Sequence, residues 1–163
     1  MKTGKKHPTF NIEHPTSSGA DAGAMELNEG GGQNRKFDLE DRLLEFASAI
    51  IDLSETLPSS RAGNHVAGQV LRSGTAPYPY HGEAEDAESR DDFIHKLKIC
   101  LKELRETRRW ARLIKRRGWA KDETALVFVL GEAEELIRIF YSSVQTAKRN
   151  ALNERRRPSG EAG

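Results

Sequence analysis

Basic residues recur along one face of the helix predicted over residues 98–117. This stretch, KICLKELRETRRWARLIKRR, contains nine Lys or Arg residues and two acidic ones. At 100° per residue, six of the cations form one row along the helix surface, and Arg108 and Lys115 widen it to one side. We call them the basic stripe, and its members are Lys98, Lys102, Arg105, Arg108, Arg109, Arg112, Lys115 and Arg116. The stripe extends over about 27 Å at roughly 1.5 Å rise per residue.

A row of positive charge of this length suits the phosphate backbone of a nucleic acid. Duplex DNA carries about one negative charge per 1.7 Å of its axis, so the basic stripe spans several phosphates. Most of the stripe is arginine, whose planar guanidinium group matches phosphate oxygens better than a lysine ammonium group does. The pattern therefore predicts a surface that binds RNA or DNA.

Two other interpretations of the basic stripe remain open. Charges on the outer face of a helix are commonly only solvated, and cations near a helix C-terminus are stabilised by the helix dipole. Alternatively, the acidic segment over residues 81–93 neutralises part of the stripe, within one chain or between subunits. Its carboxylates belong to Glu83, Glu85, Asp86, Glu88, Asp91 and Asp92.

Two helical patterns precede the basic helix. Residues 37–58 carry an apolar residue at every third or fourth position, with Asp38 as the predicted N-cap. The second pattern follows the capping residue Ser60. Pro77 and Pro79 must kink or interrupt it, because proline lacks an amide donor and clashes with the preceding turn. We expect the helix to resume after them.

The basic helix and one further helix complete the set. Ser89 is the predicted N-cap of the basic helix, and Gly118 is its predicted stop. The last helix begins near Asp122 and keeps the same apolar rhythm. Because the connections at Pro58 and Gly118 are short, consecutive helices must be antiparallel neighbours. We therefore predict an all-α fold, an antiparallel up-and-down four-helix bundle.

Polar segments flank this bundle on both sides. Residues 1–36 are rich in Gly, Ser, Thr, Asn and Pro, and residues 151–163 are similarly polar. Such segments bury too little apolar surface to offset the entropy lost on ordering. We predict disordered tails around a bundle that covers residues 37–150.

Apolar residues beside the core seams leave the assembly state open. They are Ile94, Leu101, Val127, Val129, Leu136 and Ile139, with Trp110 on another side of its helix. Since a bundle helix needs one apolar stripe, a second apolar surface predicts self-association. The alternative is a wide stripe buried within a small bundle.

The remaining reactive residues do not form a catalytic set. A carboxylate-bridged di-iron bundle needs paired Glu-x-x-His elements, whereas Asp92 and His95 form a single, incomplete match. Cys100 lies on an apolar seam, which predicts a core residue rather than a nucleophile. We therefore expect no enzymatic activity, no metal and no cofactor.

The cysteine content and the apolar runs indicate the cellular compartment in which we expect the protein. The single cysteine excludes an internal disulfide and fits a reducing environment. No apolar run has the length of a signal-peptide core or of a membrane span. We expect a cytoplasmic protein that does not contact a membrane.

One part of the sequence resembles a known family. The similar positions are Gln69, Arg72–Ser73, Glu83–Ala84, Ala87–Arg90, Asp92–Lys96, Lys102–Thr107 and Trp110. Together they resemble the four-helix-bundle proteins of the 23S rRNA-intervening-sequence family, over roughly residues 37–147. Tyr80 departs from the pattern, because members of the family often carry Asn there.

This resemblance implies an assembly and a type of partner. Proteins of the family are antiparallel four-helix bundles that form rings, typically homopentamers, without established enzymatic activity. A related accessory protein of diversity-generating retroelements works with a reverse transcriptase and binds nucleic acid through a positively charged surface. Only the basic stripe carries over to that role. The resulting hypothesis is a non-enzymatic homo-oligomer that binds RNA or DNA as an accessory to such an enzyme. The alternative is a protein-only assembly scaffold.

Overall fold

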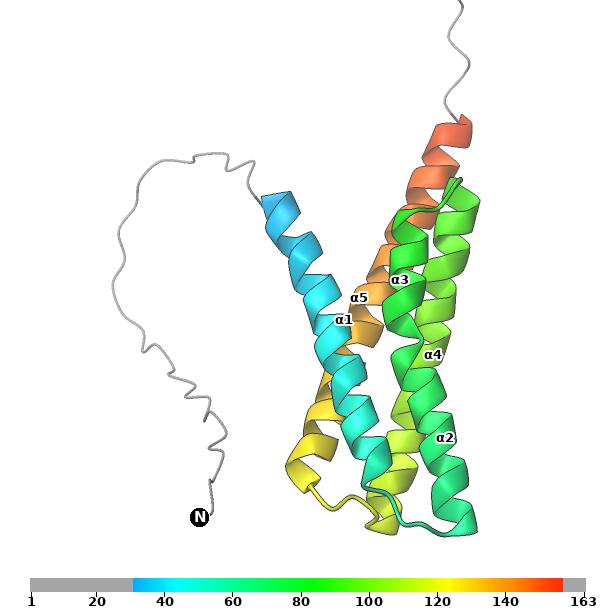
Figure 1. Ribbon diagram of the computed structural model, residues 1–163. Coiled ribbons are helices and arrows are strands. Elements are labelled where there is room, and N and C mark those ends of the chain that lie inside the picture. Colours follow the sequence, from blue (N-terminus) through cyan, green and yellow to red (C-terminus); the bar gives the residue numbers. More distant parts are fainter. Residues whose placement is uncertain (1–30, 157–163) are drawn as a thin grey trace, which may run out of the picture.

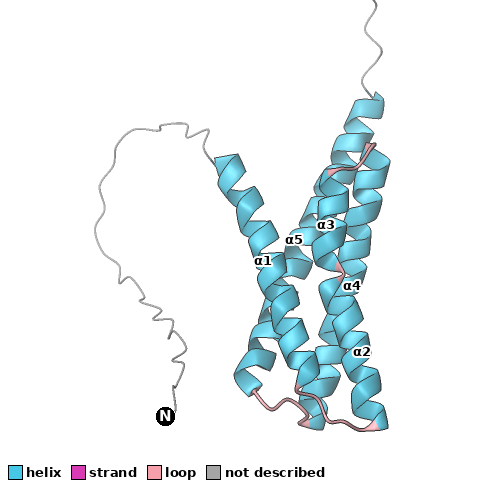
Figure 2. Cartoon of the chain, in the orientation of Figure 1, coloured by secondary structure: helices cyan, strands magenta, loops and turns pink. Residues whose placement is uncertain are grey.

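The computed structural model describes residues 31–156, with side chains described from residue 39 to residue 154. These residues form helices joined by short loops, and no strand occurs among them (Figure 2). The helices are α1 (Gly31–Glu55), α2 (Arg61–Thr75), α3 (Pro77–Glu85), α4 (Arg90–Arg117) and α5 (Glu123–Arg156).

The helices form four rods, because α2 and α3 are two parts of one bent rod. Ala76 separates them but keeps helical dihedral angles, φ −59° and ψ −37°, and Pro77 opens α3. Pro77 and Pro79 were predicted to kink or interrupt this helix, and in the structure the rod bends there but continues. Consecutive rods run in opposite directions, and α1 diverges from the others toward its N-terminus (Figure 1). The prediction of an all-α four-helix bundle is confirmed.

Capping side chains define where the helices begin. The Ser60 hydroxyl accepts a hydrogen bond from the Gly63 amide at 3.0 Å, and Ser89 accepts one from the Asp92 amide at 3.1 Å. Asp122 caps α5, since its carboxylate accepts hydrogen bonds from two backbone amides of the first turn, at 2.8 and 3.2 Å. The predicted caps Ser60 and Ser89 are confirmed, and so is the predicted start of the last helix near Asp122.

The C-terminal stop of α4 is confirmed as well. Gly118 has φ 62° and ψ 35°, and its amide donates back to the last turn of α4. This left-handed conformation costs an L-residue with a β-carbon free energy, so glycine ends the helix at little cost.

The outer helix ends differ from the prediction. Helix α1 begins at Gly31, so Asp38 lies inside the helix and is not its N-cap. Helix α5 continues through residues 151–156, ALNERR, whose Ala, Leu, Glu and Arg favour helix. Both helices thus extend past the predicted limits of the bundle at residues 37 and 150. Residues 1–30 and 157–163, which make up most of the two predicted tails, lie outside the described residues.

The core accounts for most of the surplus apolar residues. Ile94, Leu101, Val129 and Leu136 are each at most 6% exposed, within a single chain. Their assignment to a second apolar surface was wrong, because each apolar stripe is wide enough to face two neighbouring helices. Ile139 is half-buried, and Val127 is 60% exposed.

A pair of buried hydroxyls joins α2 to α4. The Thr107 hydroxyl donates to the Ser73 hydroxyl at 3.0 Å, and Ser73 donates to the Gln69 carbonyl at 3.0 Å. Both Ser73 and Thr107 are fully buried. Because a buried polar group without a partner is costly, these bonds fix how the two helices pack.

Candidate nucleic-acid interface

The basic stripe lies on the side of α4 that faces away from the core. Seven of its eight residues are exposed: Lys98, Lys102, Arg105, Arg109, Arg112, Lys115 and Arg116. On the opposite side, the seam of α4 is buried from Leu97 through Cys100, Leu104, Thr107 and Ala111 to Ile114. The core packing of α4 therefore orients these seven cations toward solvent.

Arg108 is held differently from the rest of the basic stripe. Its Nη1 atom lies 2.9 and 2.8 Å from the two carboxylate oxygens of Glu134 on α5. Its Nε atom is buried and has no hydrogen-bond partner. Because the wheel position of Arg108 falls at the contact between α4 and α5, this guanidinium group pairs within the chain. Arg108 was predicted to bind phosphate with the rest of the stripe, but the structure places it in an ion pair with Glu134.

In the part of the chain that the structure describes, no ion pair joins a carboxylate of the acidic segment over residues 81–93 to a cation of the basic stripe. Glu83 pairs instead with Lys96, which lies outside the stripe. Among the described ion pairs, only Lys102 and Arg108 of the stripe take part, with Glu103 and Glu134 respectively. The Lys102 contact is long, at 3.5 Å, and its side chain remains 74% exposed.

Arg72 joins α2 to α4 through two carboxylates. Its Nη1 atom lies 3.3 Å from Glu103, and its other terminal nitrogen pairs with Glu106. Glu106 also accepts a hydrogen bond from the Trp110 indole at 3.3 Å. Burial alone would raise the pKa of Glu106, but the bonds from Trp110 and Arg72 outweigh it and hold that pKa below its ordinary 4.5. Glu106 is therefore ionised near neutral pH and keeps Trp110 and Arg72 in place.

This cluster explains several positions of the family-like stretch. Arg72, Ser73, Glu103, Glu106 and Trp110 all contribute to the contact between α2 and α4. Sequence spacing could not have paired them, because Arg72 and Glu106 are 34 positions apart. Their contacts indicate a role in packing the two helices together.

A shallow hollow borders the basic stripe beside one tryptophan. All of its lining residues belong to α4: Lys102, Arg105, Glu106, Arg109, Trp110 and Leu113. We call it the Trp110 hollow. Trp110 is half-buried, and Leu113 is 39% exposed among the surrounding cations. The sequence placed Trp110 on another side of the helix but did not connect it with the stripe.

Three further aromatic residues pack against the core. Tyr78, Tyr80 and Trp119 are all half-buried and contact the core cluster. Arg117 lies over the Trp119 ring, 5.2 Å from its centroid, in a cation–π contact that was not predicted.

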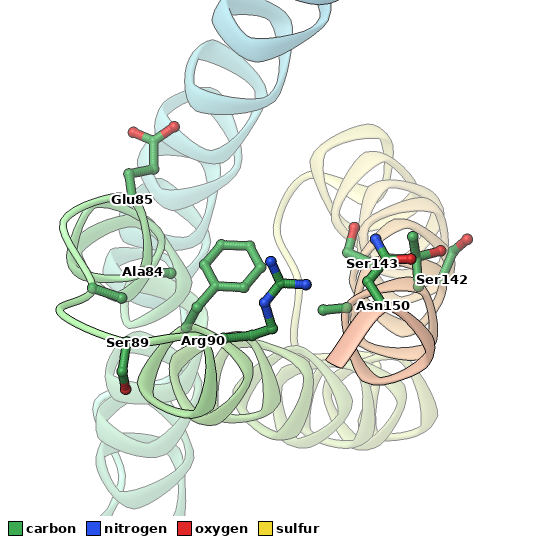
Figure 3. A pocket seen from close by; sticks show the side chains of 11 residues that line it. Ala84, Glu85, Ser89, Arg90, Ser142, Ser143 and Asn150 are labelled. Atoms are coloured by element: carbon green, nitrogen blue, oxygen red, sulfur yellow. The ribbon is translucent and has the colours of Figure 1, made fainter. Parts of the chain in front are cut away.

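A second hollow lies near the opposite end of α4, between α3, α4 and α5. Small side chains line much of it, including Ala84, Ser143 and Ala147. Figure 3 shows the Arg90 side chain extending into this space from α4 toward α5, where its guanidinium group pairs with Glu154 at 2.8 Å. Arg90 is thus engaged within the chain and lies far along α4 from the Trp110 hollow.

Cys100 is a core residue, as predicted. Its side chain is fully buried, with Sγ 3.7 Å from the Pro77 carbonyl oxygen. Burial raises the pKa of the Cys100 thiol to about 12. We expect a thiol reagent to label native protein very slowly at pH 8 and to label denatured protein rapidly, because thiolate is the reactive form. Rapid labelling of the native protein would contradict this packing.

No metal centre or membrane span is found in the part of the chain that the structure describes. Within residues 31–156, no group of three or more His, Cys, Asp and Glu side chains is arranged to hold a metal ion. Of the two residues of the incomplete Asp-x-x-His match, His95 is exposed and Asp92 is half-buried in the first turn of α4. None of the described helices is long and apolar enough to cross a bilayer.

Comparisons with known proteins agree with this architecture. The model of the family described as 23S rRNA-intervening sequence protein matches residues 35–142. A crystal structure of a protein with unknown function from the S23 ribosomal protein family of Bacteroides thetaiotaomicron is similar, with 35% sequence identity and a TM-score of 0.59. The match covers 65% of this chain and 97% of that one. No curated protein matches this chain.

Proposed function

This chain belongs to the 23S rRNA-intervening sequence protein family, and we propose that it is a cytoplasmic, non-enzymatic, homo-oligomeric bundle that binds RNA or DNA through the exposed part of the basic stripe. In this proposal it acts as an accessory to a larger nucleic-acid enzyme, such as a reverse transcriptase. In this proposal the seven exposed cations of the stripe contact the nucleic acid, whereas Arg108 pairs with Glu134 and joins α4 to α5.

One observation supports binding through phosphates most directly. Lys98, Arg105, Arg109, Arg112, Lys115 and Arg116 are exposed and take part in no ion pair among the described residues. A stripe that served only to balance internal charge would be paired with the carboxylates of its own chain. Unpaired cations over this length can instead contact a strand of phosphates.

Salt dependence tests this binding mode. If four cations engage the phosphates of a duplex, the logarithm of the binding constant should fall with the logarithm of the salt concentration with a slope of about −3.6. Changing the duplex sequence should alter the affinity little, since phosphate contacts carry no base information. Binding that does not respond to salt would contradict the proposal.

Self-association rests on a different surface from the one expected. On α1, Leu44 and Ile51 are 50% and 46% exposed, and on α5 Phe128 is 44% exposed. Leu44 and Phe128 line one shallow hollow between these helices. Exposed apolar residues that lie together commonly mark a protein contact, which also supports the alternative of a protein-only scaffold.

We expect light scattering to report an oligomer at micromolar concentration, with a pentamer as the size implied by the family resemblance. Replacing Leu44 and Ile51 by Ser should shift the population toward monomer, because it removes apolar area from the contact. The control is Leu152→Ser, the same change at a residue of α5 that is 54% exposed. A wild-type protein that remains monomeric would contradict the proposed homo-oligomer.

A further inference from the structure

The Trp110 hollow combines cationic and apolar side chains. A surface that bound phosphates alone would need only the cations. Lys102, Arg105 and Arg109 supply positive charge, while Trp110 and Leu113 supply apolar surface within the same hollow. Leu113 lies on the outward side of α4 and is 39% exposed. Part of the apolar surface of Leu113 thus remains in contact with solvent beside the guanidinium groups, where a ligand could cover it.

The indole ring of Trp110 is held in a fixed orientation. Its Nε1 atom donates to Glu106, which also pairs with Arg72 of α2. On the α2 side, the His65 ring meets the indole edge-on, with ring centroids 6.1 Å apart and an interplanar angle of 81°. A ring that is already oriented loses little conformational freedom when a ligand packs against it.

These features match an unpaired nucleotide. A flat base can pack on Trp110 and Leu113 while its own phosphates contact the neighbouring arginines, as in proteins that bind single strands through aromatic and cationic side chains. A base-paired nucleotide cannot do this, because its faces are covered by the stack and a duplex presents its phosphates outward. We propose that the Trp110 hollow is a stacking subsite for an unpaired base of a single-stranded nucleic acid, an inference that rests on the proposed function.

An abasic strand separates base stacking from phosphate contact. The protein for this test is the full chain carrying Trp119→Phe, which leaves Trp110 as the single tryptophan, since the chain contains two. The probes are a deoxythymidine oligonucleotide and an abasic oligonucleotide of equal length and charge. We expect the abasic strand to bind about tenfold more weakly, because stacking on one base is lost. Only the thymidine strand should quench the fluorescence of Trp110.

A matched pair of variants assigns this difference to the hollow. Leu113→Ser should bring the affinities for the two strands close together, while leaving the salt dependence of both unchanged. Leu152→Ser makes the same chemical change on α5 at a similarly exposed leucine, and it should keep the tenfold difference. Far-ultraviolet circular dichroism of both variants checks that the bundle is intact.

The remaining outcomes distinguish this inference from the proposed function. Equal affinities for the two strands, both weakened by salt, would overturn the stacking subsite and leave phosphate binding in place. Failure of both strands to bind would overturn the proposed function together with the subsite. An acidic peptide of equal charge that quenches Trp110 as strongly as the thymidine strand would assign the hollow to a protein partner.

Discussion

Reversing three charges at the centre of the basic stripe is expected to weaken nucleic-acid binding strongly. The variant replaces Arg105, Arg109 and Arg112 by Glu. These side chains are exposed and without carboxylate partners among the described residues, so their replacement removes three phosphate contacts and adds three repulsive charges. We expect the affinity for a duplex to fall at least about a hundredfold, or about 2.7 kcal/mol. A filter-binding assay measures the loss.

The salt dependence of the same variant provides a second measurement. Each phosphate contact on duplex DNA contributes roughly 0.9 to the slope, so any remaining binding should show a slope shallower by about 2.7. The fold should be unaffected, because the three side chains make no contact with the core that would be lost. Circular dichroism and light scattering should therefore match those of the wild type.

A control with the same change in net charge separates local contact from general repulsion. Arg138, Lys148 and Arg149 are exposed cations of α5 and lie outside the basic stripe. Replacing them by Glu breaks only an exposed pair between Arg138 and Glu135, which contributes little to stability. We expect this variant to retain most of the affinity. Equal losses in the two variants would refute a local interface, and an unchanged affinity of the stripe variant would refute nucleic-acid binding by the stripe.

The second large effect is expected at Gly74 of α2, which packs against Ile50 of α1. A β-carbon built on Gly74 would lie 2.6 Å from both Cγ1 and Cγ2 of Ile50 and 2.9 Å from its Cδ1. Ile50 is fully buried and β-branched, so it cannot rotate freely away. We expect Gly74→Ala to lower the free energy of unfolding by about 2 to 3 kcal/mol, as overpacking of a core does. Urea denaturation measures this change.

Gly68 provides the matched control in the same helix. No atom lies within 4 Å of a β-carbon built there. Gly68→Ala should therefore raise the free energy of unfolding by about 0.5 to 1 kcal/mol, because alanine restricts the unfolded chain and favours helix. If both substitutions changed the stability alike, the close approach at Gly74 would be refuted.

A double-mutant cycle identifies the contact responsible. Ile50→Ala alone should cost about 2 to 5 kcal/mol, because it leaves a cavity in the core. Added to this background, Gly74→Ala should be neutral or stabilising, since the new methyl group enters the space vacated by Ile50. The cycle should therefore show a strong coupling between the two positions, and additive effects would exclude the proposed clash.

Short-range patterns in the sequence determined the helices and most of their ends. Ser60, Ser89, Asp122 and Gly118 act within a few residues along the chain, so each could be assigned from local residue types alone. The same holds for the buried seam of α4 and for the outward direction of the stripe, since both follow from helical periodicity. The outer ends of α1 and α5 were the exceptions, since α1 begins before Asp38 and α5 continues past residue 150, where the mostly polar sequence does not mark a helix end.

The tertiary structure decided which residues of neighbouring helices meet. The pairing of Arg108 with Glu134, the engagement of Arg72 by two carboxylates and the burial of Leu101 and Val129 depend on how the rods are rotated and spaced. A helical wheel shows the faces of one helix but not the neighbours that those faces contact. For this reason the sequence by itself determined a four-helix bundle with a basic outer face. The packing of α2 and α5 against α4 decided which of the described cations pair with carboxylates and how Trp110 is held beside the stripe.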